Sequence, residues 1–105
     1  SLVILGRNGE AIACYDKALT FKPEYYKAHS NRGNALLNLG KFQRAIACYD
    51  RAIKIQPHDP EVWYNRGCAL MAFEKLEEAV SSFETAIEIK PDHVGSWINL
   101  GTVLS

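Results

Sequence analysis

This sequence lacks an excess of charge of either sign, long hydrophobic runs and a leader segment. Its 105 residues hold 12 Lys and Arg against 12 Asp and Glu, so the formal net charge at pH 7 is zero. No apolar run approaches the roughly 18 residues that span a bilayer, and no charged segment followed by an apolar one opens the chain. We therefore expect a cytoplasmic protein with no membrane partner.

Cysteine and histidine are too few and too scattered for most kinds of site chemistry. The chain has 3 of each, with no C-x-x-C motif, no Cys/His cluster at metal-ligand spacing and no histidine paired with a nucleophile in a catalytic motif. Cys14 and Cys48 are separated by roughly 50 Å of helical path, so they are not expected to pair. His58 and His93 are expected to be solvated groups in turns. We predict no enzyme activity, no metal and no cofactor.

What the sequence does contain is a repeat of 34 residues, which links Gly33, Gly67 and Gly101. Self-similarity at a fixed period of this length indicates stacked helical or strand units, each of which buries its apolar face against its neighbours. The whole chain therefore forms a single array. The same step also links Ala11, Ala45 and Ala79; Ala18, Ala52 and Ala86; Tyr15, Tyr49 and Phe83; and Pro23, Pro57 and Pro91.

Apolar spacing within each period is helical. Glu10–Thr20 places small and apolar side chains at i, i+4 and i+7, which is one stripe of a helix. Before it, Val3–Leu5 is expected to end an earlier helix at Gly6, and Asn8-Gly9 to form a turn. Asp59-Pro60 is a strong helix start, because the acid caps the first turn and proline needs no N–H bond there. The other expected helices are Tyr26–Leu39, Phe42–Ile55, Pro60–Phe73, Leu76–Lys90 and Val94–Leu104.

The residues that recur resemble the tetratricopeptide repeat, whose pattern is W-x2-L-G-x2-Y, A-x3-F and P. The resemblance covers nearly all of the chain, and it implies an all-α fold: antiparallel helix hairpins stacked into a right-handed solenoid. Arg32 and Arg66 depart from the pattern where Leu is usual, and Leu36 and Leu70 where Tyr is usual. The pattern is filled by Trp63, Gly67, Ala79, Phe83 and Pro91, and its start again by Trp97, Leu100 and Gly101.

The period also sets the expected boundaries. Residues 1–25 would be a partial repeat, 26–59 and 60–93 two complete repeats, and 94–105 the first helix of a further one. Because the chain opens with Ser inside a repeat, we expect a fragment of a longer array of the bacterial type.

The resemblance implies that the first helix of each repeat lines a concave face that binds a peptide segment of a protein partner. Asn31, Asn65 and Asn99 recur there at the 34-residue period. An amide offers donors and an acceptor, which suits it to hold the backbone of an extended peptide. The alternative, that each amide satisfies a neighbouring helix, stays open. The other candidate residues of this face are Lys27, Asn34, Asn38, Tyr64 and Met71.

Chaperone cofactors of this family hold a C-terminal carboxylate with a clamp of Lys, Asn, Asn, Lys and Arg. Asn34 and Asn65 match the two asparagines of that clamp, but Ser30, Gly95 and Asn99 stand in place of its three basic residues. The resemblance therefore does not extend to the carboxylate clamp.

Two functions remain after these exclusions. The first is a non-catalytic module for protein–protein interaction; the alternative is a structural segment that associates head to tail. Trp97, Leu100 and Leu104 would be uncovered at one end, and the Glu10–Thr20 helix at the other. Residues 1–57 carry a net charge of +5 and residues 58–105 a net charge of −5, which favours contact of the front of one copy with the back of another.

Nucleic acid is not an expected partner, because only one half is basic and no aromatic residues interleave with the charge. An enzyme elsewhere in a parent chain stays open.

Overall fold

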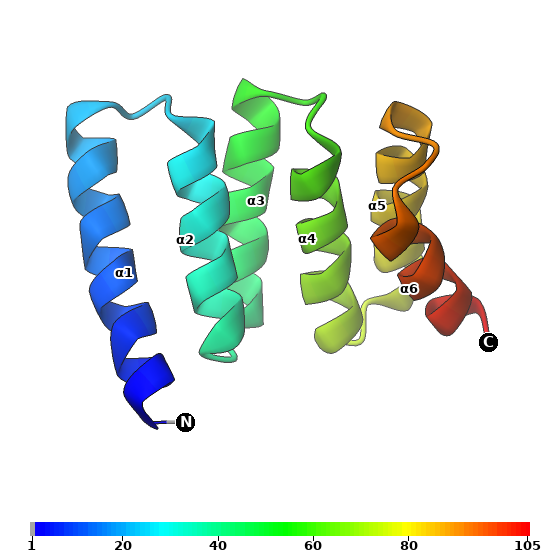
Figure 1. The fold of residues 1–105 in the computed structure, drawn as a ribbon, viewed down its shortest axis with the longest axis horizontal. Helices are drawn as coiled ribbons and strands as arrows, with labels where there is room; N and C mark the ends of the chain where they lie inside the picture. Colours follow the sequence, from blue (N-terminus) through cyan, green and yellow to red (C-terminus); the bar gives the residue numbers. More distant parts are fainter. Residues whose placement is uncertain (1) are drawn as a thin grey trace.

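The computed structural model describes the backbone of residues 2–105 and the side chains from Arg7 onward. Over this range the chain is helical, with no strand, as the sequence predicts. The helices stand side by side in a row, with the chain termini at opposite ends (Figure 1). They are α1 (Leu2–Phe21), α2 (Tyr26–Asn38), α3 (Phe42–Ile55), α4 (Pro60–Ala72), α5 (Leu76–Ile89) and α6 (Val94–Leu104).

The start of the chain differs from the prediction. Instead of a helix end at Gly6 and a turn at Asn8-Gly9, α1 runs unbroken from Leu2 to Phe21. A Cβ built on Gly9 would meet no atom within 4 Å, so this glycine lies on an open face of the helix. A glycine inside a helix costs only about 1 kcal/mol relative to alanine. The surrounding helix-forming residues outweigh that cost, and glycine alone was a poor signal for a turn.

The stacking of the helices makes one face closer-packed than the other. Each helix packs on the next one in the chain, and α2 contacts α4, which in turn contacts α6. Within residues 2–105, no Cα atom of α1, α3 or α5 lies within 8 Å of a Cα atom of another of these three helices. Helices that approach on one side and separate on the other form a curved stack. The side of α2, α4 and α6 is therefore the inner, concave one, and the outer helices lie farther apart.

The two hairpin turns share one geometry but not one residue type. Gly40 has φ 78° and Glu74 has φ 62°, and both lie in the left-handed region. In each turn the following amide returns to the helix end: Lys41 N–H donates to the Leu36 carbonyl at 2.9 Å, and Lys75 N–H to the Leu70 carbonyl at 2.8 Å. The left-handed conformation costs a residue with a side chain roughly 1–2 kcal/mol. The second hairpin thus accepts backbone strain that Gly40 avoids in the first.

An aromatic ring N–H ties each inter-repeat loop to the helix that follows it. Trp63 Nε1–H donates to the Pro57 carbonyl at 2.9 Å, and Trp97 Nε1–H donates to the Pro91 carbonyl at 2.7 Å. His29 Nε2 lies 3.0 Å from the Pro23 carbonyl at the corresponding place. The sequence analysis missed this role of the tryptophans, although the spacing of six residues after each proline recurs at the 34-residue period.

The core of each hairpin is an aromatic ring packed on a glycine. Tyr49 and Phe83 are fully buried. A Cβ on Gly33 would lie 2.8 Å from Cε1 of Tyr49, and one on Gly67 would lie 2.6 Å from Cε1 of Phe83. The sequence predicts that Gly33 with Ala45, and Gly67 with Ala79, are small residues where the two helices of a hairpin touch. Both alanines are fully buried, and the atoms nearest to a Cβ on each glycine are those of the ring.

The two ends of the stack differ from this pattern. Ala11, Tyr15 and Ala18 of α1 are half-buried, whereas their counterparts in α3 and α5 are fully buried beneath the preceding helix. At the other end Trp97 and Leu104 are exposed, as expected. The prediction for Leu100 was wrong: it is buried in a cluster with Leu70, Ala79 and Phe83.

Candidate functional site

A groove of about 340 Å³ lies on the inner side of the stack between α2 and α4. Lys27, Asn31 and Asn34 reach it from α2, and Asn65 from α4, so four of the predicted residues come together there. The other predicted residues do not line it. The remaining lining residues are Tyr26 and Ser30 from α2, with Asp59, Glu61 and Val62 from the start of α4.

The rim of this groove is held by a hydrogen bond between the two repeats. The Tyr26 hydroxyl donates to Oδ2 of Asp59 at 2.9 Å. That bond, together with burial and the charge of Asp59, raises the pKa of the Tyr26 phenol. The other carboxylate oxygen of Asp59 accepts from the Glu61 backbone N–H at 3.0 Å and so caps α4, as predicted. Asp59 thus fixes both the start of α4 and its distance from α2.

The three asparagines at the 34-residue period are not equivalent. Asn31 is exposed and Asn65 is half-buried; both line the groove, and neither amide is hydrogen-bonded within the described part of the chain. Asn99 instead donates from Nδ2 to the Tyr64 hydroxyl at 3.4 Å and to Sγ of Cys68 at 3.3 Å. Asn99 therefore links α6 to α4, whereas Asn31 and Asn65 keep their amides available for a ligand.

Asn34 serves the core as well as the groove. Its Oδ1 accepts from the Tyr49 hydroxyl at 2.5 Å, and burial raises the pKa of that phenol. At the corresponding positions of the next hairpin stand Cys68 and Phe83. Phenylalanine has no hydroxyl and needs no acceptor, so the exchange of Asn for Cys follows from the exchange of Tyr for Phe. This paired change was the sequence signal for a structural Asn34, and only its Nδ2 remains for a ligand.

Tyr64 and Met71 contribute packing. The Tyr64 ring lies 6.1 Å from that of Phe83 and 5.1 Å from that of His93, measured between centroids. Burial raises the pKa of the Tyr64 phenol. A Cβ on Gly95 would lie 3.0 Å from this ring, which explains the glycine there. Met71 packs against the cluster around Phe83, and Asn38 is exposed outside the groove.

His93 is a buried capping residue, so its prediction as a solvated turn group was wrong. Its Nδ1 accepts from the Ser96 backbone N–H at 3.2 Å and lies 2.8 Å from the Ser96 hydroxyl. Nε2 therefore carries the proton of the neutral ring, and it donates to Oε1 of Glu61 at 2.7 Å. One period earlier Asp59 stands in place of His93 and Lys27 in place of Glu61, so the acidic and the basic residue are reversed. This reversal was the available sequence signal.

The two arginines that replace leucine in the repeat pattern each bridge three successive helices. Arg32 of α2 donates from Nε to Oδ1 of Asp16 on α1 at 2.7 Å, and its Nη1 lies 3.0 Å from Sγ of Cys48 on α3. One period on, Arg66 donates to Asp50 at 2.7 Å and to Oγ of Ser82 at 2.6 Å. These bridges lie on the outer side of the stack and join each helix to both of its neighbours in the chain.

Sequence profiles of the tetratricopeptide repeat match residues 1–93 of the chain. A profile described as Tetratricopeptide repeat matches residues 26–59 and again 60–93, and one described as TPR repeat matches residues 1–40. No curated protein sequence matches the chain. Among the described helices, none is long and apolar enough to cross a membrane.

Solved structures give the same result. The first TPR of Spaghetti (RPAP3), bound to the HSP90 peptide SRMEEVD, is 30% identical, with 93% of this chain and 78% of that chain covered at a TM-score of 0.90. The first TPR domain of human RPAP3 is also 30% identical, over 93% and 77% of the two chains, with a TM-score of 0.91.

A third likeness is to the second TPR domain of human RPAP3 in complex with the HSP70 peptide SGPTIEEVD. It is 25% identical, over 95% of this chain and 83% of that one, at a TM-score of 0.90. From the profile matches and the stacked hairpins together, the chain belongs to the tetratricopeptide repeat family, and it forms an all-α solenoid of that family.

Proposed function

We propose that this chain is a non-catalytic interaction module that binds an extended peptide segment of a protein partner in the groove between α2 and α4. The observation that carries the proposal is the pair Asn31 and Asn65, whose amides line the groove without an intramolecular hydrogen bond in the described part of the chain. An extended peptide presents N–H and C=O groups on both edges, and an amide pairs with either. The RPAP3 domains, bound to HSP90 and HSP70 peptides, support this class of ligand.

The ligand would be held by its backbone rather than by a terminal carboxylate. The peptides in both RPAP3 complexes end in EEVD. At the positions matched to the basic residues of a carboxylate clamp, this chain has Ser30, Gly95 and Asn99. The Tyr64 ring fills the space beside Gly95, and Asn99 is bonded to α4, so neither offers a cation. The charged groups of the groove are instead Lys27 on one side and Asp59 and Glu61 on the other.

Asn65→Ala is expected to weaken peptide binding by about 0.5–1.5 kcal/mol, the usual net value of one hydrogen bond. Its effect on the melting temperature should be small, because the amide has no bond to lose in the free protein. A peptide selected by display against this chain would serve as the probe, with affinity measured by calorimetry and stability by circular dichroism.

The matched control is Asn99→Ala, which removes the bonds to Tyr64 and Cys68 and should therefore lower the melting temperature. A marked loss of stability in Asn65→Ala, with the affinity for the peptide unchanged, would show that this amide is structural and that the groove is not the site.

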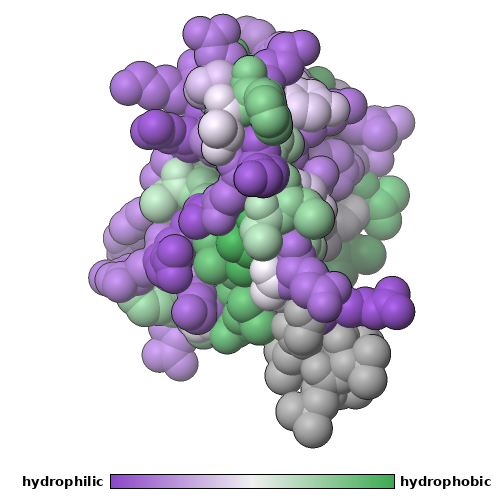
Figure 2. Space-filling model, turned by 90° about the vertical axis from the view of Figure 1, so that its left-hand side faces the viewer, coloured by the Kyte–Doolittle hydropathy of each residue, from purple (hydrophilic) through white to green (hydrophobic). Residues whose placement is uncertain are grey.

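Exposed apolar side chains at both ends favour a second function, the head-to-tail assembly of copies. On α6 the exposed fractions are 66% for Val94, 62% for Ile98 and 69% for Leu104. Figure 2, which faces the α1 end, shows hydrophobic side chains gathered in a band with hydrophilic borders. The two ends differ, so their contact would be heterologous and would build open chains unless the geometry closes a ring. The basic first half of one copy would attract the acidic second half of another, which favours head-to-tail contact.

Sedimentation at several protein concentrations should then show association that Leu104→Glu weakens. Leu104 is preferable to Trp97 as the test position, because the Trp97 indole N–H holds the Pro91 carbonyl and its loss would also disturb the fold. A protein that stays monomeric up to millimolar concentration would exclude head-to-tail assembly.

A further inference from the structure

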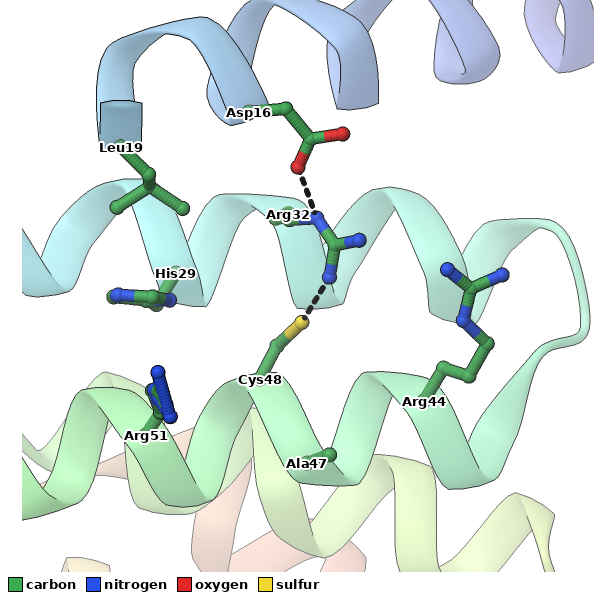
Figure 3. Close-up of a pocket in the computed structure, with 8 residues that line it drawn as sticks. All are labelled: Asp16, Leu19, His29, Arg32, Arg44, Ala47, Cys48 and Arg51. Carbon is green, nitrogen blue, oxygen red and sulfur yellow. Dashed lines mark hydrogen bonds and ion pairs between the residues drawn. The ribbon is translucent and has the colours of Figure 1, made fainter. Parts of the chain in front are cut away.

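A second cavity lies on the opposite, outer side of the stack. A cleft of about 330 Å³ lies between α1 and α3, with α2 as its floor (Figure 3). Asp16 enters from α1, His29 and Arg32 from α2, and Arg44 and Arg51 from α3. This volume is at the lower end of the range for ligand sites. It admits a few side chains of an extended segment but not a helix, which is 10–12 Å across.

The cleft is strongly basic. Three arginines line it against a single aspartate, and that aspartate is already paired with Nε of Arg32 at 2.7 Å. Arg44 and Arg51 are exposed, and in the part of the chain that is described neither has a carboxylate within 4.0 Å. Two arginines with no counter-charge thus lie along one wall, on either side of the Arg32 bridge (Figure 3).

Packing does not require these two cations. One period further on, the same bridge joins α3, α4 and α5: Arg66 contacts Asp50 and Ser82 just as Arg32 contacts Asp16 and Cys48. However, Glu78 stands at the position of Arg44 there, Thr85 at that of Arg51, and Trp63 at that of His29. The next repeat therefore has the same framework without the excess of positive charge. The cations of the cleft are an addition to a scaffold that folds without them.

The spacing of the two arginines indicates the shape of the ligand. Arg44 and Arg51 are seven residues apart on α3, which is two helical turns and about 10 Å along one face. In an extended peptide of the polyproline II type, which has three residues per turn, side chains three residues apart lie on the same face and are separated by roughly the same distance, at about 3.1 Å per residue. Arginine pairs with carboxylates through two parallel N–H donors, which favours it over lysine for such a contact.

We propose that the outer cleft is a second binding site, which takes an extended acidic peptide segment with two carboxylates three residues apart on Arg44 and Arg51. The Arg32 bridge lies between them, with its charge balanced by Asp16, and keeps its bonds to Asp16 and Cys48. The site goes beyond the proposed inner groove, and the two lie on opposite sides of α2. One molecule would therefore hold two peptide segments at once, one by its backbone and one by its charge.

The probe is a fluorescein-labelled heptapeptide of glycine and serine with glutamate at its second and fifth positions, and fluorescence polarisation measures its binding. Arg44→Gln with Arg51→Gln is expected to weaken binding about tenfold. Lys22→Gln with Lys54→Gln removes the same net charge from exposed lysines that do not line the cleft, and should change the affinity less than about twofold. Gln favours helices, and circular dichroism would check that both double variants fold.

Transplanting the arginines gives an independent test. Glu78→Arg with Thr85→Arg places them at the corresponding positions of α5, and the stoichiometry of peptide binding should rise from one to two. The proposal would be overturned by equal losses in the two glutamine double variants, by an unchanged stoichiometry after the transplant, or by inorganic phosphate binding as tightly as the peptide. Asn65→Ala should leave this binding unchanged, so a failure here is distinguishable from a failure of the inner groove.

Discussion

Phe83→Ala should lower the free energy of unfolding by about 3–5 kcal/mol, the usual cost of deleting a buried aromatic ring. The side chain of Phe83 is fully buried among Leu70, Ala79 and Leu100. A protein of this size is stabilised by only about 5–15 kcal/mol in total, so the variant should lose a large part of its stability.

Urea denaturation followed by circular dichroism would measure this loss. Phe21→Ala is the matched control, because Phe21 is 85% exposed and should tolerate the same change with little effect. If Phe83→Ala unfolded at the urea concentration of the parent protein, the ring would not be the centre of the hairpin core, and the packing described for α4 and α5 would be wrong.

The second large effect should be the opposite response of two glycines at the same repeat position. Gly67→Ala places a Cβ 2.6 Å from the buried Phe83 ring, and overpacking of this kind typically costs about 1–3 kcal/mol. Gly101→Ala adds the same methyl group where no atom lies within 4 Å. There the better helix propensity of alanine should stabilise the protein by up to about 1 kcal/mol.

Thermal melting of the two variants beside the parent is a sufficient test, since the substitution is identical and only its surroundings differ. Stabilisation of both variants would mean that Phe83 moves aside at little cost, and that Gly67 is not required for the close approach of α4 and α5.

The regular part of this fold could be predicted because its signals are local. Proline after each second helix, Asp59-Pro60 before α4 and the helical spacing of apolar residues place the ends of α2 to α6 to within one residue. The error at α1 came from treating Gly6 and Gly9 as breaks, although an isolated glycine only weakens a helix. A local pattern does not show whether the neighbouring residues outweigh that weakening.

The bonds of the candidate site were harder to foresee, because they join residues from neighbouring helices. Asn99 on α6 is hydrogen-bonded to Tyr64 and Cys68 on α4. Its equivalent Asn65 makes no such bond to the preceding repeat, although the two share one repeat position. The period alone treats them as the same residue. The difference follows from what faces each amide, which depends on the residues of the preceding repeat and on the angle at which the helices cross.

The proline loops give this protein two built-in optical reporters. Trp63 and Trp97 are its only tryptophans, and each indole N–H is bonded to the carbonyl of the loop that precedes its helix. Indole emission depends on the polarity and hydrogen bonding around the ring, so each tryptophan senses the junction between one helix pair and the next. In arrays whose units are coupled only to their neighbours, unfolding can begin at one junction and spread. Replacing either tryptophan by histidine, which at His29 keeps a ring nitrogen 3.0 Å from the corresponding proline carbonyl, leaves a single indole, and the two proteins together would resolve which junction opens first.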